Sequence, residues 1–212
     1  MTTSISQDGI RGVLHHATGA LQAGLVLTHG AGANCNAPLL VSVAEAFANN
    51  GFSVLRCDLP FRQRKPAGPP TRSTAAEDRA GLRSATAFLR EQLAGSPIVL
   101  GGHSYGGRQA TMLAAEEFAV ADALLLLSYP LHVPDKPEQL RTEHFPRLRT
   151  PALFVHGTKD PFGTPEEVRK ALALIPGRHE VQFIEGAGHD LRRPAFDLEA
   201  VVAEVIRLLS GS

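Results

Sequence analysis

The sequence has little of three features that each indicate a particular class of protein: charge of one sign, long hydrophobic runs, and cysteine. Its 21 Lys and Arg residues balance 21 Asp and Glu residues, which argues against binding to nucleic acid or to an anionic membrane surface. The longest uninterrupted aliphatic run, Ala123 to Leu127, is far shorter than the ~20 residues that a membrane helix needs. We therefore expect a small-molecule partner, and the oligomeric state stays open.

Only two cysteines are present, Cys35 and Cys57, which is too few for a disulfide framework. No Cys-x-x-Cys or His-x-x-x-His spacing indicates a metal site, so both thiols are expected to be reduced and incidental. Residues Met1 to Ile10 are polar and lack the basic-then-apolar pattern of a signal peptide. We expect a cytoplasmic protein.

The length of 212 residues favours one domain, residues 1–212, with a core that buries about 70% of the unfolded surface. Short β-rich runs alternate with longer helical patterns from about residue 23 onward. This alternation predicts an α/β fold, with a mostly parallel sheet flanked by helices on both faces. An earlier hairpin is expected around the Asp8-Gly9 turn. The expected strands are Gly24 to His29, Phe52 to Cys57, Pro97 to Gly101, Ala123 to Ser128, Ala152 to His156 and Val181 to Ile184.

Helix starts are indicated at two capping boxes. Thr74 with Glu77 three residues later is one, and Thr164 with Glu167 is the other, with proline at the first helical position. A last helix is expected from roughly Ala195 to Leu209, ending before a glycine. These signals fill the intervals between strands with helices, as the βαβ pattern requires.

Residues Pro97 to Gly107 contain the most informative motif. An apolar strand pattern breaks into Gly-x-Ser-x-Gly and passes directly into helix formers, Arg108 to Phe118, as in a nucleophile elbow. A serine on so tight a turn is crowded by strand and helix, so only very small residues fit two places away, here Gly102 and Gly106. The motif makes Ser104 the candidate nucleophile.

A serine hydroxyl is a weak nucleophile and needs a base that is itself oriented by a carboxylate. Asp160 lies just beyond the strand Ala152 to His156, and His189 lies in the loop after the next strand. Both loops are expected at the same edge of the sheet as Ser104, in the order Ser, Asp, His. The less favoured candidates for the acid are Asp190, Asp58 and Asp135.

Three segments, Gly102 to Gly106, His156 to Asp160 and Gly188-His189, each match a catalytic loop of the α/β-hydrolases, in that family's order. The chain resembles this family over nearly its whole length. Thr28 to Gly32, followed by Asn36 and Pro38, is similar to the dienelactone-hydrolase-like branch that includes the KANL3/Tex30 group. True dienelactone hydrolases have cysteine at the elbow, so the serine here argues against that specific activity.

An oxyanion hole is the second requirement of such chemistry. One donor should be the amide of Tyr105, which follows the nucleophile at a helix N-terminus. The resemblance assigns the other donor to Ala31, with Gly32 as the rival. Gly30 and Gly32 also fit a simpler interpretation, in which they only permit a tight strand-to-helix turn.

The other histidines are weaker candidates. Those at strand ends beside glycines are expected to pack and hydrogen bond rather than act as bases; they are His29, His103 and His156. The rest are interpreted as surface or loop residues: His15, His16, His132, His144 and His179.

The resemblance and the three residue types together imply a serine-dependent, carboxylesterase-like hydrolase. It would act on a small carboxylic ester or thioester through an acyl-enzyme on Ser104, with no cofactor. The alternative is a non-catalytic α/β-hydrolase-like scaffold that binds partners, because this fold hosts many functions.

Two long connections bear on the substrate. Leu59 to Ser73 carries basic residues, among them Arg62 and Arg64, and no acidic residue, so it is either a solvated basic loop or a feature that favours anionic substrates. Tyr129 to Pro151 stands where many members of the family insert a cap, and it is too short to build one. We therefore expect an open cleft that prefers short acyl chains.

Overall fold

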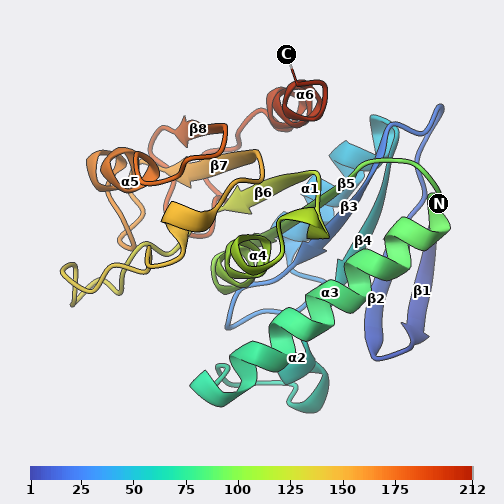
Figure 1. The fold of residues 1–212 in the computed structure, drawn as a ribbon, viewed down its shortest axis with the longest axis horizontal. Helices are drawn as coiled ribbons and strands as arrows, with labels where there is room; N and C mark the ends of the chain where they lie inside the picture. The colour runs from blue at the N-terminus through green and yellow to red at the C-terminus, as the bar shows by residue number, and fades with distance from the viewer. Residues whose placement is uncertain (212) are drawn as a thin grey trace.

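The computed structural model describes residues 1–211, apart from the side chain of residue 72, and its centre is an eight-stranded sheet (Figure 1). The strand order is β1-β2-β4-β3-β5-β6-β7-β8. β1 and β2 form an antiparallel hairpin, β2 is antiparallel to β4, and the other neighbouring strands are parallel. The strands are β1 (Thr2–Gln7), β2 (Ile10–His15), β3 (Ala23–Thr28), β4 (Phe52–Cys57), β5 (Ile98–His103), β6 (Ala123–Leu127), β7 (Ala152–Gly157) and β8 (His179–Ile184).

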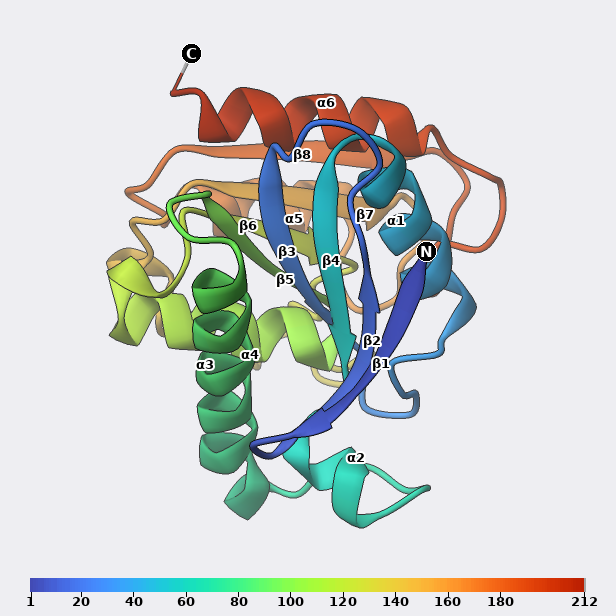
Figure 2. The ribbon, with the colours of Figure 1, turned by 90° about the vertical axis from the view of Figure 1, so that its right-hand side faces the viewer.

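Helices fill the connections between the parallel strands. The α-helices are α1 (Pro38–Asn49), α2 (Pro60–Arg64), α3 (Ala75–Gln92), α4 (Tyr105–Glu116), α5 (Pro165–Leu172) and α6 (Leu198–Leu209). Short 3₁₀ turns are η1 (Arg72–Thr74), η2 (Phe118–Val120) and η3 (Phe145–Arg147). Figure 2 shows α1 and α6 on one side of the sheet and α3 and α4 on the other.

The two sides of the sheet bury separate apolar layers, because successive strand residues point to opposite faces. Leu25 and Val99 pack with α1 and α6. Val26 and Leu100, one residue further along each strand, pack with α3, α4 and α5. The predicted α/β class, with a mostly parallel sheet covered on both faces, is confirmed.

The leading hairpin is also confirmed. Gln7 pairs with Ile10 across a two-residue turn, and both turn residues, Asp8 and Gly9, have positive φ, 51° and 75°. Turns of this kind match the right-handed twist of the strands, which explains the Asp-Gly pair. The predicted strand Phe52 to Cys57 has the bounds of β4, whereas β8 begins at His179, before the predicted Val181.

One of the two predicted capping boxes is wrong. Thr164 and Glu167 form theirs, with the hydroxyl and the carboxylate each accepting from the other residue's amide. The Thr74 hydroxyl instead donates to the Thr71 carbonyl, because η1 already curls the chain before α3 begins. The last helix begins at Leu198 rather than near Ala195, since the preceding residue is its N-cap.

The long connections differ from each other. The predicted loop Leu59 to Ser73 contains the helix α2, whereas Tyr129 to Pro151 contains only η3 and one isolated bridge, Val133 with Lys136. No cap covers the carboxyl edge of the sheet within residues 1–211. In the same part of the chain no helix combines the length and the apolar character that crossing a bilayer would need.

Candidate active site

The candidate site lies where the parallel strands β5 and β7 and their neighbour β8 end. Ser104 follows β5, while Asp160 and His189 lie in the loops after β7 and β8. In a parallel sheet these carboxyl ends share one edge, which is where α/β proteins bind ligands. Three side chains that are 29 to 85 positions apart in sequence are thereby brought into contact.

Ser104 has the strained backbone expected of an elbow, with φ of 52° and ψ of −116°. Its amide donates to the Leu127 carbonyl at 2.8 Å, which fixes the turn to β6. A Cβ on Gly106 would lie 2.7 Å from the carbonyl oxygen of His29, and one on Gly102 would lie 2.7 Å from the Gly106 carbonyl carbon. Both contacts are too short for any larger residue, as the sequence predicts.

Ser104, His189 and Asp160 form a continuous hydrogen-bonded chain. The Ser104 Oγ lies 2.8 Å from His189 Nε2, and His189 Nδ1 lies 2.8 Å from Asp160 Oδ2. With a proton on Nδ1, the imidazole donates to the carboxylate and its Nε2 is free to accept the serine proton. This is the geometry needed to activate a serine hydroxyl.

Asp160 is only 3% exposed, and both of its oxygens are used. Oδ1 accepts a hydrogen bond from the Phe162 amide at 2.8 Å, which leaves Oδ2 aimed at His189. The ring of Phe162 lies against the imidazole of His189, with centroids 4.2 Å apart. The carboxylate and the aromatic ring together hold the imidazole on two sides.

The rival carboxylates lie elsewhere. Asp190 is exposed and pairs with Arg192 at 3.1 Å. Asp58 accepts hydrogen bonds from the Arg11 side chain and from the Cys35 amide. Neither contacts the imidazole of His189, and Asp135 lies exposed in the loop after β6. Among these carboxylates, Asp160 is the one that hydrogen bonds the His189 imidazole.

The strand-end histidines hydrogen bond to backbone. His103 Nε2 lies 2.8 Å from the carbonyl oxygen of His189, His156 Nε2 bonds the Gly163 carbonyl, and His29 contacts the Gly30 carbonyl through Nδ1. Burial lowers the pKa of His103 to about 4, so its imidazole is neutral near pH 7 and donates from Nε2. These contacts position the loops around Ser104.

The interpretation of the remaining histidines as surface or loop residues is wrong for His15, whereas His132 and His144 lie in a loop as expected but are buried there. His15 is buried in β2 beside Arg56, His132 is buried after β6, and His144 is buried against Thr111 of α4. Each lies buried beside polar groups, which sequence periodicity does not reveal.

The two candidate oxyanion donors are the backbone amides of Tyr105 and Ala31. Tyr105 is the first residue of α4, so its amide has no acceptor within the helix. The Gly30 carbonyl accepts from His29 Nδ1 at 2.8 Å and from the Ala33 amide at 3.1 Å. Because the C=O and N–H of a trans peptide point in opposite directions, the Ala31 amide is turned away from that pair.

Comparison with known proteins shows the family of this chain. The family model described as alpha/beta hydrolase domain matches residues 21–207 of the chain. The chain is an alpha/beta hydrolase. The resemblance seen in the sequence is therefore confirmed at the level of the family.

Solved structures of other alpha/beta hydrolases resemble the whole chain. Dienelactone hydrolase from Anabaena variabilis has a TM-score of 0.77 at 22% identity, over 100% of this chain and 97% of that one. Est1E from Butyrivibrio proteoclasticus has a TM-score of 0.74 at 18% identity, over 99% and 98%. XC6422 from Xanthomonas campestris, described as a serine hydrolase without a lid, has a TM-score of 0.74 at 14% identity, over 97% and 94%. At these identities the likeness shows the fold alone.

Two arginines in the basic loop of this alpha/beta hydrolase, Arg62 and Arg64, are held by other groups of the protein. Arg62 is 3% exposed, and its guanidinium donates to backbone carbonyls. Arg64 is exposed and forms an ion pair with Glu77 at 2.5 Å. Neither interpretation, a solvated cation or a contact for an anionic substrate, fits the buried Arg62, whereas Arg64 is exposed as a solvated loop predicts.

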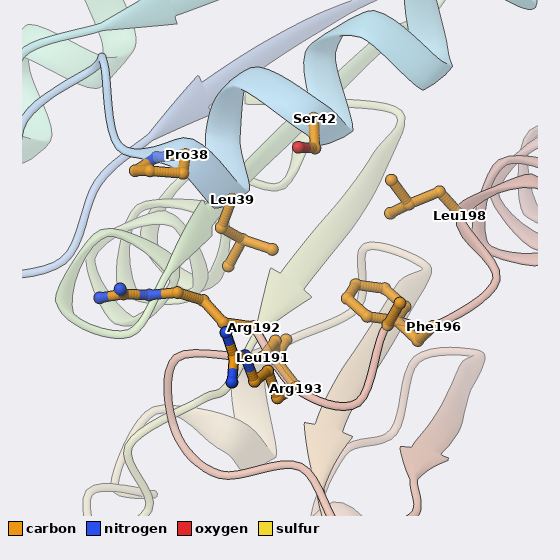
Figure 3. Close-up of a pocket in the computed structure, with 9 residues that line it drawn as sticks. Pro38, Leu39, Ser42, Leu191, Arg192, Arg193, Phe196 and Leu198 are labelled. Atoms are coloured by element: carbon orange, nitrogen blue, oxygen red, sulfur yellow. The ribbon is translucent and has the colours of Figure 1, made fainter.

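A pocket of about 350 Å³ opens between the N-terminus of α1 and the segment that follows His189. Figure 3 shows Leu39 of α1 and Phe196 on opposite sides of it, with the side chain of Arg192 extending away from Phe196. Leu191 lines the same pocket, and only one residue separates it from His189, so their Cα atoms lie within about 7 Å. A mainly apolar pocket is therefore lined by a segment that begins two residues after His189, while Ser104 and His189 themselves are not among its lining residues.

Cys35 and Cys57 are free and buried, and burial raises their pKa values to about 11 and about 12. Within residues 1–211 no cluster of three or more His, Cys, Asp or Glu side chains is arranged to hold a metal ion.

Proposed function

We propose that the chain is a serine-dependent hydrolase that cleaves a small carboxylic ester or thioester through an acyl-enzyme on Ser104. The observation that carries this proposal is the unbroken chain of 2.8 Å hydrogen bonds from Ser104 through His189 to the buried Asp160. A non-catalytic scaffold has no need of a strained serine held in that arrangement. Strain of this kind persists only where the surrounding structure enforces it.

In the acylation step, Ser104 Oγ attacks the carbonyl carbon of the ester as its proton passes to His189 Nε2. The carbonyl π electrons move onto oxygen, and the amides of Ala31 and Tyr105 stabilise that oxyanion. The intermediate then collapses, the bond to the leaving group breaks, and His189 gives its proton to the departing alkoxide or thiolate. The Asp160 carboxylate supports the positive charge that His189 carries in between.

In the deacylation step, a water molecule replaces the alcohol. His189 takes a proton from this water, the resulting hydroxide attacks the acyl carbonyl, and Ser104 leaves with the proton returned by His189. In both steps the protons pass only between Ser104, His189, the leaving group and water. No cofactor is needed.

The pocket lined by Leu39, Leu191 and Phe196 is the proposed acyl site, because it is mainly apolar and Leu191 lies two residues after His189. With no cap over the sheet edge, a long chain would emerge from this pocket into water. Ferulic acid is bound in one of the structures of Est1E, which has the same fold. For the present chain, the proposed substrate is a small ester with a short acyl group.

Labelling with a fluorophosphonate probe tests the proposal. The wild-type protein should be labelled at one serine, and Ser104→Ala should abolish labelling while its melting temperature stays close to that of the wild type. Ser84→Ala, in the exposed part of α3, is the matched control and should label normally. An unlabelled wild type would favour the non-catalytic scaffold instead.

A further inference from the structure

Arg62 is buried in a way unusual for an arginine in a surface connection. Its guanidinium donates to four backbone carbonyls and no carboxylate: Nε to Ala33 at 2.7 Å, Nη2 to Ala31 at 2.8 Å and to Gly68 at 2.9 Å, and Nη1 to Lys65 at 3.0 Å. An arginine has five N–H donors, so four are committed to the protein. A residue bound in this way has little capacity left for a substrate.

Two of these carbonyls belong to the loop between β3 and α1 that would supply an oxyanion donor. Holding the Ala31 and Ala33 carbonyls fixes the rotation of the peptide planes that follow each residue. The carbonyl of Gly30, which fixes the plane carrying the Ala31 amide, is held by His29 and Ala33. Arg62 thus secures the peptide planes immediately after that amide.

The same short helix also contacts the other oxyanion donor. The ring of Phe61 packs edge-on against Tyr105, with centroids 5.7 Å apart. The fully buried Asp78 accepts from the Phe61 amide at 3.0 Å and from the Tyr105 hydroxyl at 2.7 Å. α2 therefore braces both segments between which an oxyanion would form.

We infer that Arg62 is a positioning residue of the oxyanion hole: through its bonds to the Ala31 and Ala33 carbonyls it keeps the Ala31 amide aimed at the developing oxyanion. This inference rests on the proposed serine-hydrolase function. Arginine suits the task because its planar fork reaches several carbonyls at once, whereas lysine offers one compact ammonium with three donors. A hydrogen-bonded loop needs no reorganisation as the charge appears.

The test compares Arg62→Met and Arg62→Lys with Arg64→Met. Arg64 lies two residues further along α2, is exposed, and forms an ion pair with Glu77, so its variant controls for loss of charge in the same helix. Each protein is assayed for kcat and KM on p-nitrophenyl acetate, for inhibition by a trifluoromethyl ketone, and for melting temperature. The ketone adds Ser104 to form a hemiketal oxyanion, so its affinity reports the oxyanion hole directly.

We expect Arg62→Met to lower kcat by a factor on the order of 10², comparable to the loss of one oxyanion donor, with little change in KM. Affinity for the trifluoromethyl ketone should fall by a similar factor. Arg62→Lys should recover part of both losses. In a fourth variant, Arg62→Ala, millimolar guanidinium should restore part of kcat. Arg64→Met should behave like the wild type.

Several outcomes would overturn the inference. A folded Arg62→Met with wild-type kcat would do so, as would equal losses in Arg64→Met. If both Arg62→Met and Arg62→Lys unfold below the assay temperature, and activity only follows the folded fraction, Arg62 supports the fold as a whole and not the oxyanion hole. A wild type that neither hydrolyses the ester nor reacts with the probe would instead refute the proposed function.

Discussion

His103 hydrogen bonds the backbone of His189: its Nε2 lies 2.8 Å from the His189 carbonyl oxygen, so the residue before the elbow serine holds the loop that carries the imidazole. The two rings also lie 5.2 Å apart. Because His103 is neutral near pH 7, the contact is an ordinary hydrogen bond rather than a charge-assisted one. The elbow and the histidine loop are therefore positioned relative to each other by backbone as well as by Ser104.

Replacing His103 with phenylalanine should slow turnover without abolishing it. His103→Phe keeps a ring of similar size but removes the donor, so the His189 loop loses one restraint worth about 1 kcal/mol. We expect kcat for p-nitrophenyl acetate to fall about fivefold with KM little changed. His16→Phe, at an exposed position, is the control. An unchanged kcat in His103→Phe would mean that the bond does not position His189.

The two aspartates near His189 should differ sharply. Asp160→Asn removes the charge behind the imidazole and can hold it in the wrong tautomer, so kcat should fall by a factor on the order of 10³ to 10⁴. Asp190→Asn breaks only an exposed ion pair with Arg192, which contributes little. Steady-state kinetics of the two variants give the comparison, and the reverse ranking would reassign the acid to Asp190.

Acyl-chain preference should follow the pocket beside His189. The kcat/KM for p-nitrophenyl esters should be highest for acetate or butyrate and lower for octanoate and palmitate, because an uncovered chain gains little of the ~0.8 kcal/mol available per buried CH₂. Phe196→Ala enlarges the pocket and should move the preference to longer chains. Phe118→Ala, 73% exposed on η2, is the control. A kcat/KM that rises steadily to the longest soluble chain in the wild type would contradict an open site.

Stability should fall as the pH falls below the ordinary histidine pKa of 6.5. Burial is the main cause that lowers the pKa values of His103 and His144 to about 4 in the folded protein. Between pH 6.5 and 4 the unfolded chain therefore binds protons that the folded chain does not, and the stability present above pH 6.5 is lost. Each histidine adds a slope of about 1.4 kcal/mol per pH unit.

Urea denaturation between pH 7.5 and 5 measures this slope. His144→Gln should make it shallower by one histidine's share, whatever its effect on absolute stability, because this side chain then has no proton to gain. His16→Gln changes an exposed histidine and is the matched control. Identical slopes in His144→Gln and the wild type would mean that His144 does not bind a proton on unfolding.

The parts of the molecule that could be predicted from sequence are those fixed by local sterics and by topology. The need for glycine at positions 102 and 106 could be predicted because any side chain there would clash with backbone. The proximity of Asp160 and His189 could be predicted because the loops after neighbouring parallel strands meet at one edge of the sheet. These rules need no knowledge of distant contacts.

The features that sequence reasoning missed depend on partners distant in the chain. Arg62 looks like a solvated cation until the loop carbonyls of Ala31 and Ala33 are seen around it. His144 lies in a loop, as expected, but its burial was missed because its hydrogen-bond partner, Thr111, lies on α4. Thr74 carries a capping-box pattern, but its hydroxyl donates to the Thr71 carbonyl and does not accept from the Glu77 amide. In each case the position of the side chain depends on hydrogen bonds to backbone or to buried polar groups. Such hydrogen bonds leave no periodic pattern in the sequence.

The most direct test of the central claim is to trap the acyl-enzyme with p-nitrophenyl acetate and to locate it by mass spectrometry after acid quenching. We expect a burst of p-nitrophenol close to one equivalent per site, with a single acetyl group on the peptide that contains Ser104. Asp160→Asn should form the same adduct more slowly, and Ser104→Ala should form none. Hydrolysis that proceeds at the wild-type rate in Ser104→Ala, or an acetyl group found on another residue in the wild type, would contradict the account.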